Sequence, residues 1–343
     1  QKNWQRAHVT LSWPFDNLGP SLPNLITTIA GNLFELKQLS GIRLVDIRLP
    51  PTFSRPFTGP KFGCEGTRKL LGIYGRPIIG TIIKPSVGLS PIQTGTLVAK
   101  LCAAGIDFIK DDELQADGSN CPFDARVRSV MQAVNRAADK SGQKVMVAFN
   151  LTGEIDEMRR RHDLVVAEGG TCVMVNILGV GMSGMLALSR HADLPIHAHR
   201  AGWGALTRDA LLGWSYPAWS KLWRLAGADH MHVNGLDNKF SEANESVIAS
   251  ARSLKDPLFC DAPMSALPVF SSGQTVRQAA ATLRAVGSPD LLVTAGGGII
   301  AHPSGVAAGV KAMRQANEAA MQKIDIVQYA KEHPELAAAL TVF

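Results

Sequence analysis

The sequence predicts an α/β protein in which a small N-terminal α+β domain precedes a C-terminal (β/α)8 barrel. Short β-branched runs, each followed by a stretch with helical apolar spacing, recur eight times from about residue 75. The runs are apolar throughout, as expected of parallel strands that are covered on both faces. Polar residues follow these runs directly, and a barrel carries its active site at the C-terminal ends of its strands.

Residues 1–60 are expected to be the end of the small domain with its linker, and residues 61–343 the barrel. The chain begins at Gln1 without a methionine, so we expect an N-terminal portion to be missing. The elements expected in the first part are a strand over His8–Trp13, a helix over Asn24–Leu39, a strand over Ile42–Leu49 and a proline-rich linker over Pro51–Pro60.

The barrel is expected to contain eight strands with helical stretches between them. In order, the predicted strands are Pro77–Ile83, Gly105–Ile109, Lys144–Asn150, Cys172–Ile177, Leu194–His199, His230–Val233, Leu267–Ser271 and Leu291–Thr294. Strands that alternate with helices in this way are typical of a parallel sheet, and eight repeats close it into a barrel.

Composition narrows the class of protein. Of 343 residues, 46% are hydrophobic and 19% charged, and no apolar run approaches the roughly 18 residues of a membrane span. The formal charge of +6 suits anionic small molecules, and without a basic cluster interleaved with aromatics we expect neither nucleic acid nor a membrane as partner. Five scattered cysteines without a CxxC pair predict a reduced, cytoplasmic location and no thiolate metal site.

The stretch Gly105–Glu113 carries the strongest chemical signal. Alternation along the strand points Lys110 and Asp112 to the same side, and Glu113 can reach in from the loop. Converging carboxylates favour a hard divalent cation such as Mg²⁺. A plain ion pair of Lys110 with an acid at an exposed strand end is the alternative interpretation.

Other strand ends supply further groups. Lys84 and His199 are the candidates for proton transfer, because burial and a nearby cation can make a lysine a base. Arg200, His232 and Ser271 suggest one anion site. Glycine-rich turns after the last two strands suggest a phosphate site formed by backbone N–H groups. A metal beside such a base suits the formation of an enediolate.

With these motifs in view, the chain resembles the RuBisCO large-chain family, and more closely its non-carboxylating, RuBisCO-like members. The motifs that carry the resemblance are Gly80–Pro85, Asp107–Glu113, His197–Ala201, Asp229–His232, Leu267–Val269, Gly296–Gly298 and His302-Pro303. It extends from about residue 8 to the C-terminus. The resemblance implies a TIM barrel behind a ferredoxin-like N-terminal domain, and a homodimer, alone or in larger assemblies, with active sites shared between subunits.

The resemblance also implies roles for single residues. Lys110 would carry a CO₂-derived carbamate and bind Mg²⁺ with Asp112 and Glu113, while Lys84 and His199 would move protons. Lys239 would be the mobile-loop lysine that holds a carboxyl group, and Asn32 would enter the active site of the neighbouring subunit. Two phosphate sites are implied, one formed by Arg200, His232 and Ser271, and the other by Gly273, Gly296 and Gly297.

Departures from the family pattern argue against CO₂ fixation. Ser86 stands where carboxylating members have a second lysine, and Ile82 and Trp203 replace a threonine and a histidine. We therefore expect a Mg²⁺-dependent decarboxylase of a phosphorylated 3-oxo sugar acid, such as 3-oxoisoapionate 4-phosphate, acting through a metal-bound enediolate. One alternative is an enolase or isomerase of methylthioribulose-type phosphates, although the family's enolases of this kind have a lysine at the position of Asn32. The other alternative is a non-catalytic binding or regulatory protein.

Overall fold

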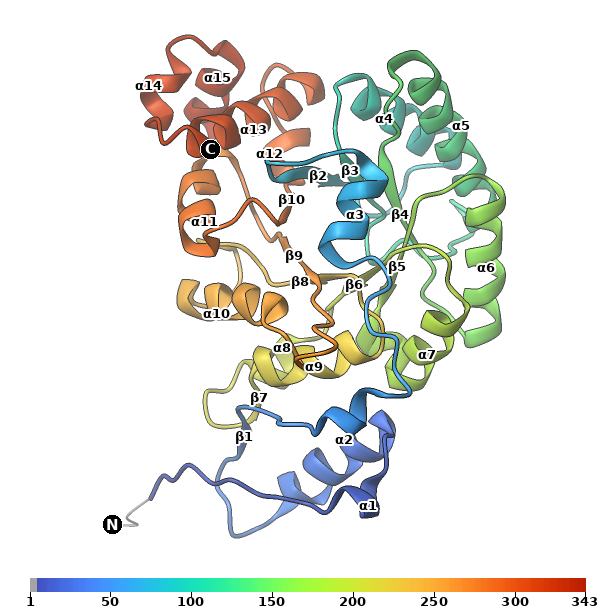
Figure 1. Cartoon of the computed structure of the whole chain (residues 1–343). Helices are drawn as coiled ribbons and strands as arrows, with labels where there is room; N and C mark the ends of the chain where they lie inside the picture. Colours follow the sequence, from blue (N-terminus) through green and yellow to red (C-terminus); the bar gives the residue numbers. More distant parts are fainter. Residues whose placement is uncertain (1–4) are drawn as a thin grey trace.

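The computed structural model describes residues 5–343, and Gln1–Trp4 lie outside the described residues. All eight predicted strands are present, and they form one closed barrel of parallel strands in the order β10-β2-β3-β4-β5-β6-β8-β9 (Figure 1). The barrel strands are β2 (Ile78–Ile82), β3 (Phe108–Lys110), β4 (Met146–Asn150), β5 (Cys172–Asn176), β6 (Ile196–His199), β8 (His230–His232), β9 (Leu267–Phe270) and β10 (Leu292–Thr294).

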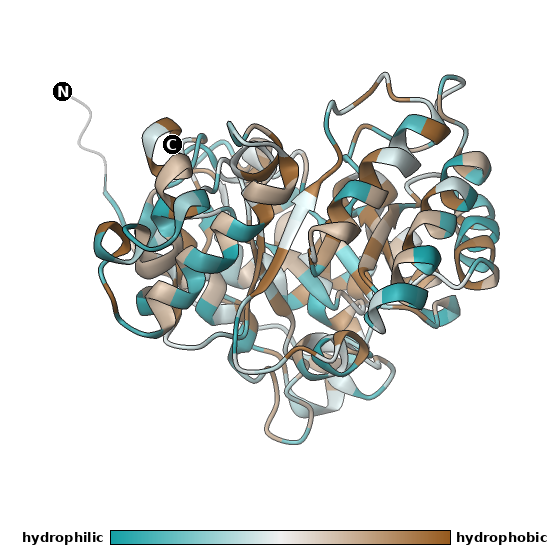
Figure 2. Cartoon of the chain, turned by 90° about the horizontal axis from the view of Figure 1, so that it is seen from above, coloured by the Kyte–Doolittle hydropathy of each residue, from teal (hydrophilic) through white to brown (hydrophobic). Residues whose placement is uncertain are grey.

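Helices surround the barrel and carry both hydrophilic and hydrophobic residues (Figure 2). They are α3 (Gly63–Leu71), α4 (Pro91–Ala103), α5 (Phe123–Ser141), α6 (Ile155–Ala167), α7 (Ile177–His191), α8 (Gly204–Thr207), α9 (Tyr216–Leu225), α10 (Asn244–Lys255), α11 (Ala279–Val286), α12 (Gly297–Ile300), α13 (Val306–Met321), α14 (Ile326–Ala330) and α15 (Pro334–Val342), with the 3-10 turn η3 (Val276–Gln278). Their ends follow the sequence. Ser90 and Gln93 form a reciprocal cap at the start of α4, and Gly142 ends α5 in the left-handed conformation.

Alternation along the strands divides the core into two parts. Residues that point into the barrel form one buried cluster, which includes Ile78, Phe108, Met146 and Leu267. Their strand neighbours point outward into a larger cluster that packs against the helices. Because side chains alternate, the next inward positions toward the C-terminal ends lie above this apolar floor, and they hold the polar residues of the predicted site.

Asp229 joins the start of the barrel domain to two strands. Its carboxylate accepts hydrogen bonds from the backbone N–H groups of Phe62 (2.6 Å), Gly63 (2.9 Å) and Ile196 (2.8 Å). The side chain is 1% exposed. Three N–H donors to one carboxylate hold α3 against the strands, and thus fix the apolar floor on which the site stands.

The N-terminal part differs from the prediction. Residues 8–13 are exposed and form no strand, because no described segment pairs with them. The predicted helix is α2 (Leu22–Ala30), which ends at the non-helical Gly31 and is followed by the 3-10 turn η1 (Asn32–Glu35). It is preceded by the short α1 (Phe15–Leu18).

The strand predicted over Ile42–Leu49 is reduced to β1 (Arg43–Leu44). It pairs in parallel with β7 (Gly213–Trp214), which lies between β6 and α9, so only two residues find a backbone partner. The predicted linker contains a 3-10 turn, η2 (Pro51–Ser54). The boundary at residue 60 stays a prediction. Within residues 5–343, none of the helices combines the length and the apolarity that a membrane crossing requires.

Candidate active site at the C-terminal ends of the strands

Lys110 is buried at the end of β3. Its Nζ donates to the backbone oxygen of Asp111 (2.8 Å) and to Glu113 Oε2 (3.1 Å). The ion pair that the alternative interpretation expected therefore exists, but at a buried strand end: the Lys110 side chain is 2% exposed. Burial lowers the pKa of Lys110, against the opposing charge of Glu113. A lower pKa favours the neutral amine, which is the form that reacts with an electrophile such as CO₂.

Lys84, at the end of β2, lies over the second carboxylate. Its Nζ donates to Asp112 Oδ2 (2.6 Å) and to Ser86 Oγ (2.8 Å), and its side chain is 40% exposed. The other oxygen of Asp112 accepts the backbone N–H of Leu114 (3.1 Å). The structure thus brings two ammonium groups and two carboxylates into one cluster.

His199, at the end of β6, faces the same cluster. Its Nδ1 accepts the backbone N–H of Ala201 (3.2 Å), so the proton of a neutral ring lies on Nε2, 3.4 Å from Glu113 Oε2. Burial, together with the charge of Lys110, lowers the pKa of His199 to about 3. For Glu113, burial acts to raise the pKa, but the neighbouring Lys110 charge and the His199 ring bring it down to about 2. The ring is therefore neutral and donates toward an ionised carboxylate.

The loop that presents these acids is held by residues that the sequence prediction had not singled out as site residues. Arg126, which is fully buried in α5, donates from Nε to Asp111 Oδ2 (3.2 Å), and the same oxygen accepts the backbone N–H of Asn150 (3.0 Å). The Asn150 amide donates to the Glu113 backbone oxygen (3.2 Å). The sequence held one signal for these contacts. Asp111 alternates in direction with Lys110 and Asp112, so its carboxylate needs a buried partner of its own.

His232 and Ser271 meet inside the barrel. His232 Nδ1 lies 3.0 Å from Ser271 Oγ, and its Nε2 lies 2.7 Å from His197 Nε2. His197 in turn contacts His230, whose Nε2 lies 2.7 Å from Thr67 Oγ1. Burial lowers the pKa of all three imidazoles. They form a neutral hydrogen-bonded column from the apolar floor to the site.

Arg200 does not contact this pair directly. Its Nη2 donates to Glu242 Oε2 (2.6 Å), and its guanidinium lies over the rings of Tyr216 (5.0 Å) and Trp203 (6.0 Å). Glu242 comes from the loop between β8 and α10. The sequence analysis did not assign Glu242 a role.

Gly273, Gly296 and Gly297 lie at the ends of β9 and β10. None of their backbone N–H groups donates a hydrogen bond within residues 5–343. A Cβ placed on Gly273 would lie 3.8 Å from Lys239 Cβ, and one on Gly296 would lie 3.9 Å from Lys84 Cε. Unsatisfied N–H groups between two lysine stems are a suitable arrangement for a phosphate.

Lys239 and Asn32 are both exposed. Lys239 belongs to the β8–α10 loop, where its backbone N–H donates to Ser272 O (3.2 Å) and its Nζ lies over the Phe240 ring (5.3 Å). Asn32 lies in η1 of the N-terminal part, and no hydrogen bond among residues 5–343 connects it to the barrel. The structure therefore brings Lys239, but not Asn32, to the site of the same chain.

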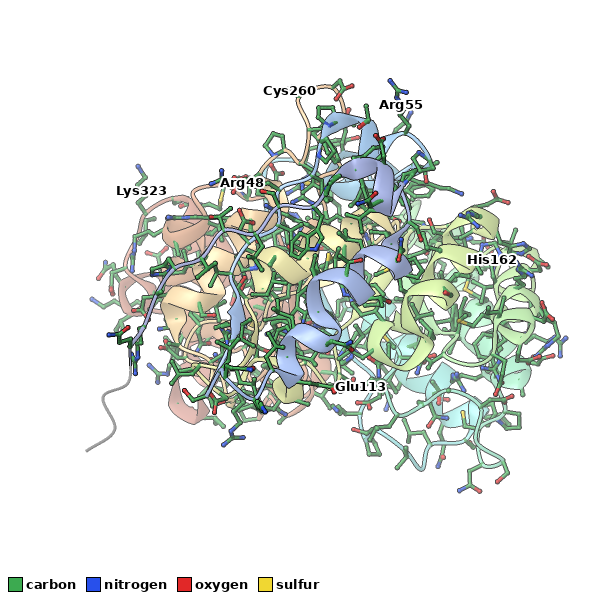
Figure 3. All side chains as sticks on the ribbon, turned by 90° about the horizontal axis from the view of Figure 1, so that it is seen from below. Arg48, Arg55, Glu113, His162, Cys260 and Lys323 are labelled. Atoms are coloured by element: carbon green, nitrogen blue, oxygen red, sulfur yellow. The ribbon has the colours of Figure 1, made fainter. Side chains whose placement is uncertain are left out.

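A second group with metal-ligand chemistry lies elsewhere. His162, Asp163 and His191 place ligand atoms within 4.8 Å of one another on α6 and α7, and His162 lies far from Glu113 (Figure 3). His162 Nε2 accepts the backbone N–H of Asp193 (3.1 Å), which leaves its proton on Nδ1, facing Asp163. His162 is thus a hydrogen-bond donor to Asp163, and the predicted metal ligands remain those at the end of β3.

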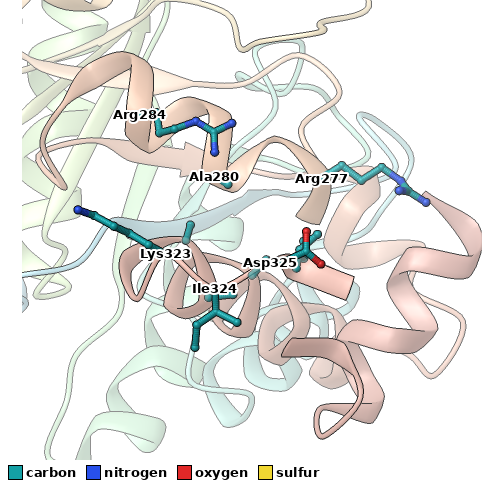
Figure 4. Close-up of a pocket in the computed structure, with 10 residues that line it drawn as sticks. Arg277, Ala280, Arg284, Lys323, Ile324 and Asp325 are labelled. Carbon is teal, nitrogen blue, oxygen red and sulfur yellow. The ribbon is translucent and has the colours of Figure 1, made fainter. Parts of the chain in front are cut away.

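A hollow of about 390 Å³ also lies away from the barrel mouth. Figure 4 shows its lining from η3, α11, α13 and the turn after α13, where Arg277, Arg284 and Lys323 lie around alanine and isoleucine side chains. Its one acid, Asp325, caps α14 through the backbone N–H groups of Val327 and Gln328. The predicted catalytic residues are absent from it, so its size does not mark the site.

Comparisons with known proteins agree with the motifs. The family model described as ribulose bisphosphate carboxylase large chain, catalytic domain, matches residues 63–343, and the model of its N-terminal domain matches residues 3–53. The chain is 63% identical over 337 residues to a Xanthobacter autotrophicus protein described as 3-oxo-isoapionate-4-phosphate transcarboxylase/hydrolase, covering 98% of this chain and 81% of that protein.

Two further proteins extend the comparison. A Rhizobium rhizogenes protein described as 3-oxo-isoapionate-4-phosphate decarboxylase is 45% identical over 341 residues, which are 99% of this chain and 81% of that protein. The crystal structure of a rubisco-like protein from Burkholderia fungorum superposes with a TM-score of 0.94 at 48% identity and covers 96% of this chain and 82% of that one.

Proposed function

Because the chain belongs to the family of the ribulose bisphosphate carboxylase large chain, we propose that it removes the carboxyl group of 3-oxo-isoapionate 4-phosphate. Relatives named for this substrate support the proposal, both the transcarboxylase/hydrolase and the decarboxylase. The observation that carries it is the single cluster of Lys84, Lys110, Asp112, Glu113 and His199 beside the loop of Lys239. A binding module has no need for this combination of acids and bases.

The donor set fits Mg²⁺. Asp112 and Glu113 offer the carboxylate oxygens that this ion prefers, and the buried amine of Lys110 lies beside them. In the proposed active form Lys110 carries a carbamate, which adds a third anionic oxygen ligand. When bound, the ion would polarise the 3-oxo group and stabilise negative charge on its oxygen.

The chain's own residues account for the remaining chemistry. Lys239 pairs with the substrate carboxylate, while the N–H groups of Gly273, Gly296 and Gly297 hold the phosphate. The bond between the carboxyl carbon and C2 breaks as the carboxyl group departs. Its electron pair forms a C2=C3 double bond, and the π pair of the 3-oxo group moves to the oxygen to give an enediolate. The Lys84 ammonium then delivers a proton to C2, and His199 donates to the developing oxygen charge.

Two fates of the carboxyl group share this first step. Release as CO₂ fits Ser86, because a serine at this position provides no second cation to keep CO₂ in the site. Transfer of the carboxyl group followed by hydrolysis is the second candidate, which is favoured by the 63% identity to the relative named for that activity.

We also propose a homodimer in which Asn32, exposed in η1, completes the site of the neighbouring subunit.

The test uses 3-oxo-isoapionate 4-phosphate labelled with ¹³C in the carboxyl group, with Mg²⁺ and bicarbonate in D₂O. The decarboxylase is expected to release the label as CO₂ and to leave one deuterium on the carbon that carried it. The transferring enzyme is expected to keep the label in an organic acid. Persistence of the unchanged substrate would overturn the proposal. In a parallel reaction with a methylthioribulose-type phosphate, entry of deuterium would support the enolase instead.

A further inference from the structure

Glu242 occupies the place where Arg200 would bind an anion. Arg200 Nη2 and Glu242 Oε2 lie 2.6 Å apart, and the two side chains are only 7% and 14% exposed. The same oxygen accepts the amide of Asn234 (2.6 Å), and Glu242 Oε1 accepts the hydroxyl of Ser246 (2.8 Å). Two further donors thus hold this largely buried carboxylate against the guanidinium.

The loop around Glu242 is itself ordered by hydrogen bonds. The side-chain amide of Asn238 donates to the backbone oxygens of Gly235 (2.9 Å) and Glu242 (3.0 Å), and Asn238 Oδ1 accepts the backbone N–H of Phe240 (2.9 Å). Moving the Glu242 carboxylate would break its three bonds and disturb the loop that carries Lys239. Glu242 is therefore a built-in neighbour of Arg200.

The pair changes what Arg200 can bind. A guanidinium attracts phosphate through its charge and its paired donors, and Glu242 uses one of these donors and cancels the charge. A phosphate brought to the same place would lie beside a carboxylate of its own sign. His232 and Ser271, the other members of the predicted phosphate site, contact each other at 3.0 Å and supply no positive charge while the imidazole is neutral.

The glycine turns offer a contrasting environment. The N–H groups of Gly273, Gly296 and Gly297 have no acceptor within residues 5–343, and the stems of Lys84 and Lys239 flank them. Lys84 Nζ is paired with Asp112 (2.6 Å), whereas Lys239 forms no ion pair with a carboxylate within residues 5–343, so its charge is not neutralised. A single phosphate group therefore has one favourable place in this site.

We propose that Glu242 selects substrates with one phosphate, because its carboxylate occupies the Arg200 position and leaves only the glycine turns for a phosphate. The inference rests on the proposed function, in which the substrate named for the relatives, a 4-phosphate, has a single phosphate. The negative charge of Glu242 and its contact with Arg200 both oppose the binding of a second phosphate. A sugar bisphosphate therefore gains no binding affinity from its second phosphate.

Calorimetric binding of ribulose 5-phosphate and ribulose 1,5-bisphosphate in Mg²⁺ buffer tests this proposal. The two ligands form a matched pair that differs by one phosphate, and neither measurement depends on decarboxylation. The wild-type protein is expected to bind both with Kd values within about threefold. Glu242→Gln, which keeps the shape and removes the charge, is expected to tighten only the bisphosphate by about tenfold or more, as expected for a charge-assisted hydrogen bond.

The matched control is Glu245→Gln, which removes the same charge from an exposed side chain in the first turn of α10 and should change neither Kd. Unchanged monophosphate affinity shows that Glu242→Gln is folded. Tenfold tighter binding of the bisphosphate by the wild type would overturn the proposal, as would an unchanged bisphosphate Kd in Glu242→Gln or equal weakening of both ligands. Failure of the decarboxylation proposal would leave these Kd values interpretable, because the difference between the two ligands reports the Arg200 position and involves no turnover.

Discussion

The substitution Lys110→Met tests whether Lys110 serves the proposed catalysis more than the stability of the barrel. The substitution removes the Nζ bonds to the Asp111 backbone oxygen and to Glu113, a loss of about 1 to 3 kcal/mol each. It also removes the cost of burying an ammonium, which is several kcal/mol. Glu113 stays 33% exposed and can be solvated by water. We therefore expect the free energy of unfolding to change by less than about 2 kcal/mol.

Activity should respond differently. Without Lys110 the proposed metal site loses one of its three anionic ligands, and several kcal/mol of transition-state stabilisation correspond to a loss in kcat/KM of about a thousandfold or more. Urea denaturation measures the first quantity, and the ¹³C assay measures the second. Lys100→Met, an exposed lysine in α4, serves as the control and should change neither. A Lys110→Met protein that keeps a tenth of the wild-type turnover, or one destabilised by more than about 4 kcal/mol, would refute this reasoning.

Three further substitutions test other parts of the molecule. Asp229→Ala leaves three backbone N–H groups, two of them buried, without their acceptor and should lower the free energy of unfolding by about 3 to 5 kcal/mol in urea titrations. A change below about 1 kcal/mol would contradict the role given to this carboxylate. Gly80→Ala would place a Cβ 2.9 Å from Phe108 Cδ1 and 3.1 Å from its Cβ, so a loss of about 1 to 3 kcal/mol is expected, and unchanged stability would mean that β2 and β3 separate easily. Lys239→Met should reduce kcat/KM for the 3-oxo acid by about 10- to 150-fold. Binding of a ketose phosphate without a carboxylate, measured by calorimetry, should weaken by a smaller factor, because Lys239 also flanks the glycine turns.

The barrel was predictable because its signals are local and repeated. Each strand is a short apolar run, and each run ends in a polar residue such as Lys84, Lys110 or His199, whose position the barrel topology then determines. The sequence could place these residues at one mouth without any knowledge of loops. Their proximity follows from strand order and alternation alone.

The N-terminal part and the loops required more than local pattern. A strand needs a neighbour, and residues 8–13 have the alternation of a strand without a described segment to pair with. Glu242 could not be placed either, because its contact with Arg200 spans 42 residues and depends on the conformation of an irregular loop. The only signal was an acid three residues after Lys239, and such a spacing has no meaning outside a helix.

The charges at the end of β3 determine how Lys110 can change its chemical state. Two ammonium groups, Lys84 and Lys110, lie against two carboxylates, Asp112 and Glu113, so the cluster is neutral. Attachment of CO₂ would turn the Lys110 cation into an anion and leave three anions with one cation in a largely buried region, which is strongly unfavourable. A divalent cation would offset this change of two charges, so in the proposed active form modification of Lys110 and binding of Mg²⁺ would favour each other. As a ligand of that ion, Asp112 would release Lys84 Nζ, and the lysine would become available to the substrate.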